Sequence, residues 1–503
     1  MTIQDNNRTI NRILFWLLVI STVVRGIIAA TIEFGNDEVY YWTYALYPDW
    51  SHYDHPPMVG YMIQLFSLNL LFDSEFFIRL ASVVFMTAET YILFRIGKEI
   101  KNARIGLYAA LLFTASIYAF IISGVFILPD TPLNLFWLLA IWMAIRYFRA
   151  EQPKSLHLVL FGLFAGLAVL SKYTGAFLWV GMGLYILLFD RKQLKRPTLY
   201  LSVLITAICC LPILIWNIQH DFISFNFHSD RVSLFGPINL SYFGTELGGE
   251  FFYNNPVNFV LAIIAVIAAF RKKVDMEKTT LRLVLCTALP LILLFWFFSL
   301  TRPTLPHWNA PAFNTLILLI ACWLPSKKPI IPSLAVLAIT VIFGIIEIQT
   351  GIIPLDHHTE DEKLGRDDFT LDMYGWHQLE TKFADFRETK IAEGVMHKED
   401  GIVANQWFPL ANLDYYVARP LGMRVMGLGD PDDIHKYLWI NEKRGGFKSG
   451  ESYWFLSDSR FMKDPVALYS DKFESIEPLG IITIERGGKP AKNFFVYACK
   501  RLK

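Results

Sequence analysis

Cysteine and charge are both scarce in this sequence. Its 503 residues include 5 cysteines, and charged side chains make up 18%, whereas soluble domains carry roughly a quarter. The cysteines lie within apolar stretches or alone near the C-terminus, which excludes a disulfide framework and a metal knuckle: Cys209, Cys210, Cys286, Cys322 and Cys499. The formal net charge is +1, and it says nothing about partners because the charges are segregated by loop and form no patch. No nucleic acid partner is expected.

Lysine and arginine are absent between Thr31 and Ser74. The same segment is rich in carboxylates, which cost free energy near a bilayer and rarely occur there without a function. They include Glu33, Asp37, Glu38, Asp49 and Asp54. We therefore expect an active site at one membrane surface.

Long apolar stretches are abundant, because hydrophobic residues make up 54% of the chain. A helix needs about 20 apolar residues to cross the hydrocarbon core of a membrane. We predict a polytopic α-helical membrane protein with about eleven such helices. Their expected ranges are 13–32, 76–97, 104–124, 131–148, 156–171, 174–189, 198–216, 256–270, 281–299, 310–324 and 329–349.

The basic residues of short loops predict the orientation of these spans, because they favour the cytoplasmic side. With the N-terminus inside, the inner loops hold nearly all of them: Lys98, Lys101, Arg104, Arg146, Arg149, Lys154, Arg191, Lys192, Lys195, Arg196, Arg271, Lys272, Lys273, Lys278, Lys327 and Lys328. The outer loops hold only Lys172, Arg231 and Arg302. An odd number of spans then places everything after Gly351 outside as well.

The composition changes near residue 350, so we expect two domains, 1–350 in the membrane and 351–503 outside. The second part is charged and contains short alternating runs at 452–456, 481–484 and 494–497, which are typical of strands. Its length suits one domain. A soluble α/β domain on the outer, periplasmic face is predicted. No internal repeat of the kind that marks many transporters is evident.

The first outer segment contains two candidate sites. Asp37 directly follows the first span, where a carboxylate can take a proton from an attacking hydroxyl. Alternatively, Asp37 and Glu38 only cap a surface helix. A second cluster, Asp54-His55-Pro56-Pro57, favours chemistry, because two prolines fix the backbone that carries an acid and an imidazole. Aromatic residues such as Tyr40 are expected to anchor short helices at the membrane surface.

The outer loops also offer cations for a phosphate group. Lys172 and Arg302 suit a lipid-phosphate leaving group, on which charge builds as the bond to a sugar breaks. Alternatively, Lys172 snorkels from the end of a span, and a structural role is equally open for Arg302. His307 can bind phosphate or sugar, or be a structural histidine held by a loop carbonyl.

A long outer loop is expected at 217–255. Its potential ligands match no established metal pattern, and we predict no metal site among them: His220, Asp221, His228, Asp230, Arg231, Glu246 and Glu250. A mobile lid over the acceptor site is the expected role, because long loops in compact proteins are often functional. Arg25 and Glu89 lie inside spans, and we expect them to pair structurally.

Several motifs resemble one known superfamily and occur in its order. They are Asn36-Asp37-Glu38-Val39-Tyr40-Tyr41-Trp42, Tyr53-Asp54-His55-Pro56-Pro57-Met58, Leu128-Pro129-Asp130-Thr131-Pro132, Ser171-Lys172-Tyr173-Thr174-Gly175 and Leu305-Pro306-His307-Trp308-Asn309-Ala310-Pro311-Ala312. The chain resembles the polyprenol-phosphate-sugar-dependent glycosyltransferases of the protein O-mannosyltransferase-like superfamily. These have the GT-C fold and include the bacterial lipid A aminoarabinose transferases. The segment 372–376 is similar to one in bacterial members.

The resemblance implies roles for individual residues. Asp37 would be the catalytic acidic residue and Asp130 a second acid. Glu38 and Tyr40 would bind substrate, as would the residues considered above for phosphate, sugar or acceptor: Asp54, His55, Lys172, Arg302 and His307. Aminoarabinose transferases carry a lysine where this chain has His55, so a fixed cation is replaced by a titratable group.

These patterns together predict an integral-membrane glycosyltransferase of the bacterial inner membrane with a periplasmic site. Its donor would be a polyprenyl-phosphate-linked sugar, and its acceptor hydroxyl would belong to lipid A, a protein or another glycan or lipid. Direct displacement would invert the anomeric carbon. The sequence identifies no cofactor with certainty, and a requirement for a divalent cation stays open. The alternatives are a flippase for lipid-linked sugars, which should carry ionisable residues near the bilayer midplane, and a non-catalytic glycan-binding scaffold.

Overall fold

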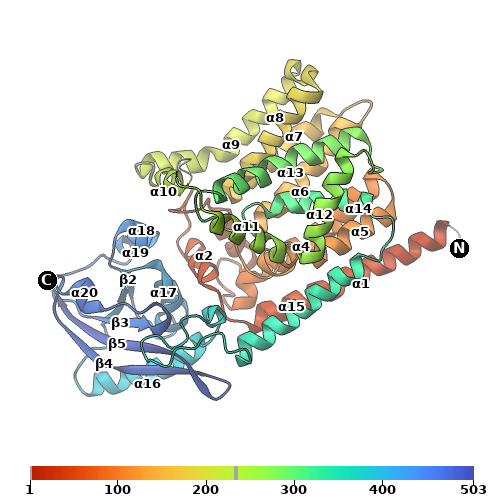
Figure 1. Ribbon diagram of the computed structural model, residues 1–503. Coiled ribbons are helices and arrows are strands. Elements are labelled where there is room, and N and C mark those ends of the chain that lie inside the picture. The colour runs from red at the N-terminus through yellow and green to blue at the C-terminus, as the bar shows by residue number, and fades with distance from the viewer. Residues whose placement is uncertain (1–2, 232–235) are drawn as a thin grey trace. The chain divides into compact units, whose positions relative to one another are not determined.

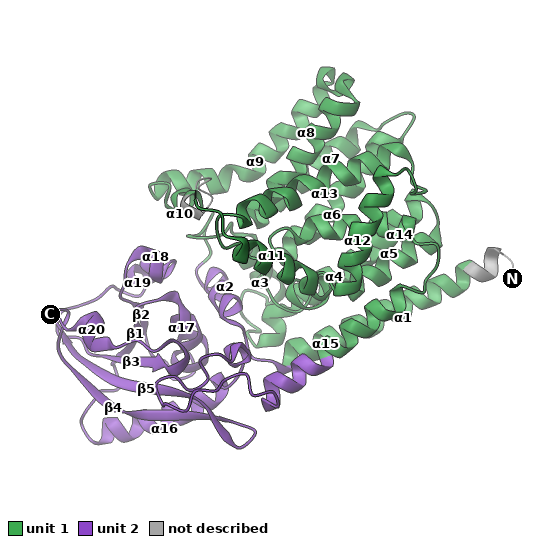
Figure 2. Cartoon of the chain, viewed as in Figure 1, with its two compact units in different colours: residues 1–30, 48–341 green, residues 31–47, 342–503 purple. Residues whose placement is uncertain are grey.

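The chain forms two compact units in the computed structural model, which describes residues 3–231 and 236–503. Unit 1 comprises Met1–Ala30 and Pro48–Val341, and unit 2 comprises Thr31–Tyr47 and Ile342–Lys503 (Figure 2). The expected boundary at residue 350 stays a prediction. The assignment of the acidic segment 31–47 to the C-terminal unit was not foreseen from the sequence.

The regular elements in the described part of unit 1 are all helices (Figure 1). Its elements are α1 (Ile3–Thr31, ending at the unit boundary), α3 (Met58–Phe66), α4 (Glu75–Ile100), α5 (Ala103–Ala115), η1 (Tyr118–Ile122), α6 (Asp130–Arg149), α7 (Ser155–Ser171), η2 (Tyr173–Ala176), α8 (Phe177–Phe189), η3 (Arg191–Lys195), α9 (Pro197–Gln219), α10 (Ile223–Arg231), α11 (Leu240–Tyr253), α12 (Pro256–Phe270), α13 (Lys278–Ser299), α14 (Ala310–Trp323) and α15 (Ile330–Thr350, which continues into unit 2).

Each expected span coincides with helical structure. Among the described residues, six helices are long and apolar enough to cross a membrane, namely α1, α4, α6, α9, α13 and α15. Helices α11 and α12 count as a seventh span if taken together, although they meet at a bend of 105°. Shorter apolar helices occupy the other expected ranges at 103–115, 155–171, 173–189 and 310–323. The exact number of spans stays a prediction.

These helices carry apolar side chains at the protein surface as well as in the protein interior. Only 22% of the most apolar window of α9 is buried within the protein, and a helix that exposes such a surface needs lipid around it. Small residues let some helices pack closely. A Cβ at Gly162 on α7 would lie 2.3 Å from the backbone oxygen of Ser202 on α9, which explains why glycine stands there.

The segment 217–255, expected as a long outer loop, contains the helices α10 and α11. The sequence analysis did not foresee these two helices, and the position of the segment outside the membrane stays a prediction. The side chains of Asp230 and Arg231 lie outside the part of the chain that the structure describes.

Unit 2 contains a five-stranded sheet in the order β2-β1-β3-β5-β4. Strand β1 is parallel to β2 and β3, whereas β5 is antiparallel to β3 and β4. Its elements are α2 (Asn36–Leu46), η4 (Phe369–Met373), α16 (Trp376–Ala392), β1 (Gly401–Ala404), α17 (Trp407–Asn412), η5 (Leu413–Ala418), β2 (Val425–Gly427), α18 (Pro431–Ile434), α19 (Tyr437–Lys443), β3 (Tyr453–Asp458), η6 (Ser459–Phe461), α20 (Pro465–Tyr469), β4 (Phe473–Arg486) and β5 (Lys489–Leu502).

The three alternating runs recognised in the sequence coincide with strands β3, β4 and β5, and only Ser452, the first residue of the first run, lies outside its strand. The α/β prediction for the C-terminal part is therefore confirmed. Helix α16 packs on the sheet, where the rings of Phe383 and Trp454 lie 5.4 Å apart.

Candidate active site

A buried ion pair joins two helices of unit 1. Asp130 is the first residue of α6, and Lys172 follows α7 in an extended conformation. The Lys172 Nζ lies 2.8 Å from the Asp130 Oδ2, and the two residues are 5% and 2% exposed. Charges are costly to bury, and in membrane proteins they often mark functional sites. The structure thus brings two predicted site residues together.

The second oxygen of Asp130 begins a chain of hydrogen bonds. The Tyr118 hydroxyl donates to Asp130 Oδ1 at 2.8 Å, and Asn134 Nδ2 donates to that hydroxyl at 2.9 Å. Asn314 on α14 donates to the side-chain oxygen of Asn134 at 3.2 Å. Sequence reasoning missed these three residues, although Asn134 follows Asp130 by one helical turn and shares its face of α6. The network holds the Asp130 carboxylate in one orientation.

Two histidines from distant loops interact with this ion pair. His55 is partly buried, and burial, opposed by the charge of Asp54, lowers its pKa to about 3. His307 is also partly buried, and burial together with the charge of Lys172 lowers its pKa to about 4. Both imidazoles are therefore neutral near pH 7. Each offers an N–H or a lone pair rather than a fixed positive charge.

Helix α10 contributes a third histidine to the same place. His228 Nε2 donates to the backbone carbonyl of Asp54 at 2.7 Å. Its ring centroid lies 6.2 Å from that of His55 and 4.9 Å from that of Tyr173. The segment expected to act as a lid therefore contacts the predicted site residues Asp54 and His55. Its movement as a lid stays a prediction.

Two buried glutamates of α11 hold the loop 300–309. Thr304 Oγ1 donates to Glu246 Oε2 at 2.7 Å, and the side chain of Asn309 donates to Glu250. Both glutamates are fully buried. From the sequence alone, no role could be assigned to these two glutamates. Only the fold brings them into contact with the loop 300–309. The loop carries two predicted site residues, Arg302 and His307.

The other predicted residues lie on α2 in unit 2. Asp37 stands exposed in the first turn of this helix. Glu38 is buried and accepts a hydrogen bond from the Gly35 backbone nitrogen at 3.0 Å, so it does cap the helix. Tyr40 is also buried, and its ring lies 5.0 Å from that of Trp407. The substrate-binding roles expected of Glu38 and Tyr40 stay predictions.

The C-terminal part of unit 2 holds the segment that carries α2. Before the helix, Glu33 accepts hydrogen bonds from the backbone nitrogens of Trp376 and His377 at 2.8 and 3.0 Å. After it, Lys436 Nζ donates to the carbonyl oxygens of Thr43 and Tyr47 at 3.0 and 2.6 Å. A cation at a helix C-terminus also interacts favourably with the helix dipole. These contacts position the backbone on both sides of Asp37.

Only one group of three side chains in the described residues could hold a metal ion, and it consists of Asp356, His358 and Asp367 in unit 2. None of these is among the predicted site residues. His358 Nδ1 already lies 2.8 Å from Asp356 Oδ1. The expectation of no metal site in the segment 217–255 stays a prediction.

We expect acidification to destabilise unit 1 through His55. The pKa of this imidazole is about 3 in the folded protein and 6.5 as its ordinary value. Between these two values the unfolded chain binds more protons than the folded protein. The contribution of His55 to the free energy of unfolding is therefore complete above pH 6.5 and is lost progressively as the pH falls below it. For one imidazole, the free energy of unfolding falls by at most about 1.4 kcal/mol for each pH unit.

The measurement is thermal unfolding of the purified protein at about pH 7 and about pH 5.5. On going from the higher to the lower pH, the midpoint temperature of unfolding should fall in the wild type and should fall less in His55→Gln. A matched variant, His397→Gln, changes a histidine outside unit 1 and should retain the wild-type fall. Equal falls in wild type and His55→Gln would contradict the assignment.

Comparisons with known proteins agree with the motifs. A family model described as dolichyl-phosphate-mannose-protein mannosyltransferase matches residues 54–216, a range that includes Asp54, His55, Asp130 and Lys172. The chain is 26% identical over 299 residues to the lipid A galacturonosyltransferase RgtD of Rhizobium johnstonii. The matched part is 58% of this chain and 60% of the length of that relative.

Crystal structures of ArnT from Cupriavidus metallidurans share the fold over almost the whole chain. The apo structure matches with a TM-score of 0.62 at 13% identity, covering 97% of this chain and 98% of ArnT. The structure bound to undecaprenyl phosphate has the same score and identity and covers 96% and 97%. The polytopic helical fold with a C-terminal α/β domain is thereby confirmed. So is the resemblance to the GT-C glycosyltransferases.

Proposed function

We propose that this fold serves an integral-membrane glycosyltransferase, which moves one sugar from a polyprenyl phosphate to an acceptor hydroxyl. The observation that carries the proposal is the buried Asp130–Lys172 pair, with His55 and His307 as electrostatic neighbours. A cation and neutral N–H donors at the end of apolar helices suit a lipid-borne phosphate. A soluble nucleotide sugar would instead call for a glycine-rich phosphate loop, which the sequence lacks.

In the proposed reaction the acceptor oxygen attacks the anomeric carbon of the sugar. The bond from that carbon to the phosphate oxygen breaks, and the lipid phosphate leaves with the electron pair. Asp37 takes the proton of the acceptor hydroxyl as general base. Direct displacement inverts the anomeric configuration. Lys172, assisted by Arg302, stabilises the charge that develops on the phosphate.

Asp130 has a positioning role in this proposal. It holds Lys172 in place before the donor binds, and Tyr118 fixes the carboxylate. An arriving phosphate would give Lys172 a second anionic partner. Because His55 and His307 are neutral, they can donate N–H groups to phosphate or sugar oxygens at little electrostatic cost.

The names of the similar proteins support the choice of substrates. RgtD is a lipid A galacturonosyltransferase, and one ArnT structure contains undecaprenyl phosphate. We accordingly propose undecaprenyl phosphate or a similar polyprenyl phosphate as the carrier and lipid A as the first acceptor to test. A protein or another glycan is the remaining acceptor class.

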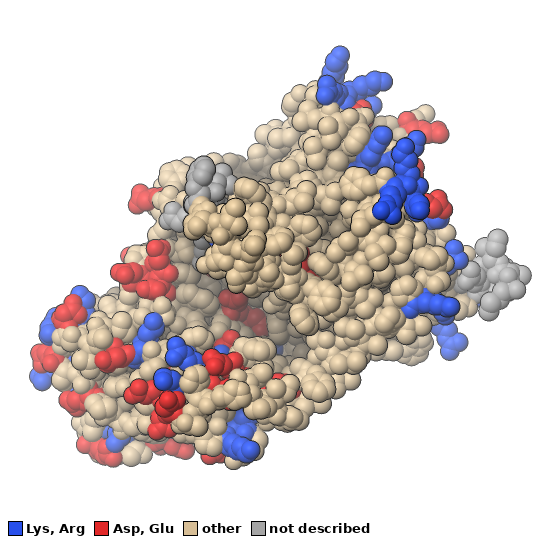
Figure 3. Space-filling view, viewed as in Figure 1, with Lys and Arg blue, Asp and Glu red and all other residues tan. Residues whose placement is uncertain are grey.

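We place the reaction at the periplasmic face of the bacterial inner membrane. The loops predicted to be cytoplasmic contact one another at one end of unit 1, where Arg146 lies 3.0 Å from Glu99 and Arg149 lies 3.7 Å from Glu277. Figure 3 shows lysines and arginines gathered along one edge of this unit. In a cysteine-free background, an impermeant thiol reagent added from the periplasm should label Ser74→Cys and leave Lys192→Cys unlabelled. The reverse pattern would contradict this orientation.

The function is tested with purified protein in nanodiscs that contain undecaprenyl-phosphate-linked sugars. Lipid A is supplied as the acceptor, and products are identified by mass spectrometry and by the anomeric configuration of the new bond. We expect a sugar-modified lipid A with inverted configuration. A fluorescent lipid-linked sugar that crosses proteoliposomes without any transfer product would favour the flippase alternative.

A further inference from the structure

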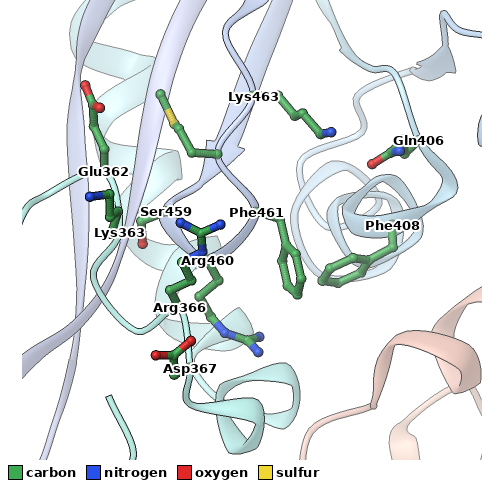
Figure 4. Close-up of a pocket in the computed structure, with 11 residues that line it drawn as sticks. Glu362, Lys363, Arg366, Asp367, Gln406, Phe408, Ser459, Arg460, Phe461 and Lys463 are labelled. Carbon is green, nitrogen blue, oxygen red and sulfur yellow. The ribbon is translucent and has the colours of Figure 1, made fainter. Parts of the chain in front are cut away.

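Unit 2 contains a cavity that the proposed reaction does not use. Its volume is about 570 Å³, which is within the range of small-ligand sites. It lies between η6 and the segments around positions 365 and 407 (Figure 4). Its lining consists of Glu362, Lys363, Arg366, Asp367, Gln406, Phe408, Ser459, Arg460, Phe461, Met462 and Lys463.

Four of these lining residues are cations and two are acids, so the lining carries an excess of positive charge. Arg366 and Lys463 are exposed, and within the described part of the chain neither side chain has an ion pair or a hydrogen bond to protein. They are therefore available to a ligand without the loss of an existing contact. An arginine fork matches the oxygens of a phosphate, and a lysine adds a compact charge.

Arg460 supplies a third cation that is already held in place. It is 5% exposed, its Nε donates to the Gly365 carbonyl at 3.1 Å, and its Nη1 pairs with Asp372. Within residues 3–231 and 236–503, no protein group accepts a hydrogen bond from Nη2. A preorganised guanidinium loses little side-chain entropy when it binds an anion.

Two aromatic rings form another side of the cavity. The rings of Phe408 and Phe461 lie 5.2 Å apart at an interplanar angle of 86°, and Phe461 is 44% exposed. Figure 4 shows them side by side, with Arg366 and Arg460 next to them. An exposed aromatic face packs well against the C–H face of a pyranose ring. Gln406 adds an amide, of which one N–H is held by Asp433 at 3.0 Å.

We propose that this cavity binds a phosphorylated sugar, with the phosphate on Arg366, Lys463 and Arg460 and the sugar ring on Phe408 and Phe461. Aromatic faces beside cations suit such a ligand better than inorganic phosphate or a neutral sugar, because each part of the ligand has its own partner. If the proposed function holds, the ligand is the phosphorylated saccharide headgroup of the acceptor, and the cavity is a recognition site on unit 2.

The test is binding of glucose 1-phosphate to the full-length protein in detergent, measured by saturation-transfer NMR and titration. We expect glucose 1-phosphate to bind more tightly than glucose and inorganic phosphate. The double variant Arg366→Gln/Lys463→Gln should weaken its binding at least ten-fold, and Phe461→Ala should weaken it without changing the binding of inorganic phosphate. Wild-type affinity in the double variant would overturn the proposal, as would equal affinity for glucose 1-phosphate and inorganic phosphate.

A matched control removes two positive charges elsewhere on unit 2. Lys398→Gln/Lys448→Gln changes two exposed lysines outside the cavity lining, and it should retain wild-type affinity for glucose 1-phosphate. An equal loss in this control would show a general charge effect and would overturn the proposal.

Competition distinguishes the two sources of the ligand. If lipid A in mixed micelles displaces glucose 1-phosphate, the site recognises a lipid headgroup. If glucose 1-phosphate stays bound in excess lipid A, the site recognises a soluble sugar phosphate, and the assignment to the lipid acceptor fails. Because no donor is present, this binding measurement is independent of sugar transfer, and its failure is distinguishable from failure of the proposed function.

Discussion

Replacement of Asp37 by asparagine should reduce sugar transfer by about 10²–10⁴-fold, the usual contribution of a general base. The carboxylate is exposed in the first turn of α2, and asparagine has the same size and also suits a helix N-terminus. Folding should therefore be normal while the proton acceptor is lost. The measurement is turnover of undecaprenyl-phosphate-linked sugar by purified wild-type and variant protein, together with their thermal unfolding midpoints.

The matched control is Asp49→Asn. It makes the same chemical change in the same acidic segment, at a side chain that accepts a hydrogen bond from the Trp50 backbone nitrogen at 2.7 Å. We expect this variant to transfer sugar at close to the wild-type rate. If Asp37→Asn turned over as fast as Asp49→Asn, Asp37 would have no role in proton transfer and would be left with helix capping.

Replacement of Lys172 by methionine should destabilise the protein by roughly 3–5 kcal/mol, because it leaves a buried carboxylate without its cation. Asp130 is 2% exposed and lies among helices, so water cannot readily replace the ammonium group. Adding Asp130→Asn removes the unpaired charge and should recover most of the lost stability. The two effects are measured by unfolding of the single and double variants under identical conditions.

Activity separates a structural ion pair from a functional one. The double variant Lys172→Met/Asp130→Asn should fold and still fail to transfer sugar, because the cation for the leaving phosphate is gone. Lys101→Met is a suitable control, since it breaks an exposed pair with Asp275 and should cost at most about 1 kcal/mol. Restored transfer in the double variant would mean that the pair only stabilises the bundle.

Much of the architecture could be predicted from the sequence, because each feature rests on a short-range pattern. An apolar run long enough to cross a bilayer must satisfy its backbone hydrogen bonds internally, so the expected spans became helices. The alternating runs at 481–484 and 494–497 became strands because one face of the sheet is buried. The family resemblance at positions 128–132 and 171–175 singled out Asp130 and Lys172, which the structure pairs at 2.8 Å, and their catalytic roles stay predictions.

Tertiary structure decided which side chains meet. Tyr118, Asn134 and Asn314 carry no local signal of partnership, yet they form one hydrogen-bonded chain to Asp130. Lys436 donates a hydrogen bond to the backbone of Thr43 in α2, although the two residues are 393 positions apart in the sequence. Such contacts depend on how helices and strands pack rather than on any periodicity along the chain. The pKa of His55 belongs to this group too, because burial, which only the packed fold creates, makes a titratable residue neutral.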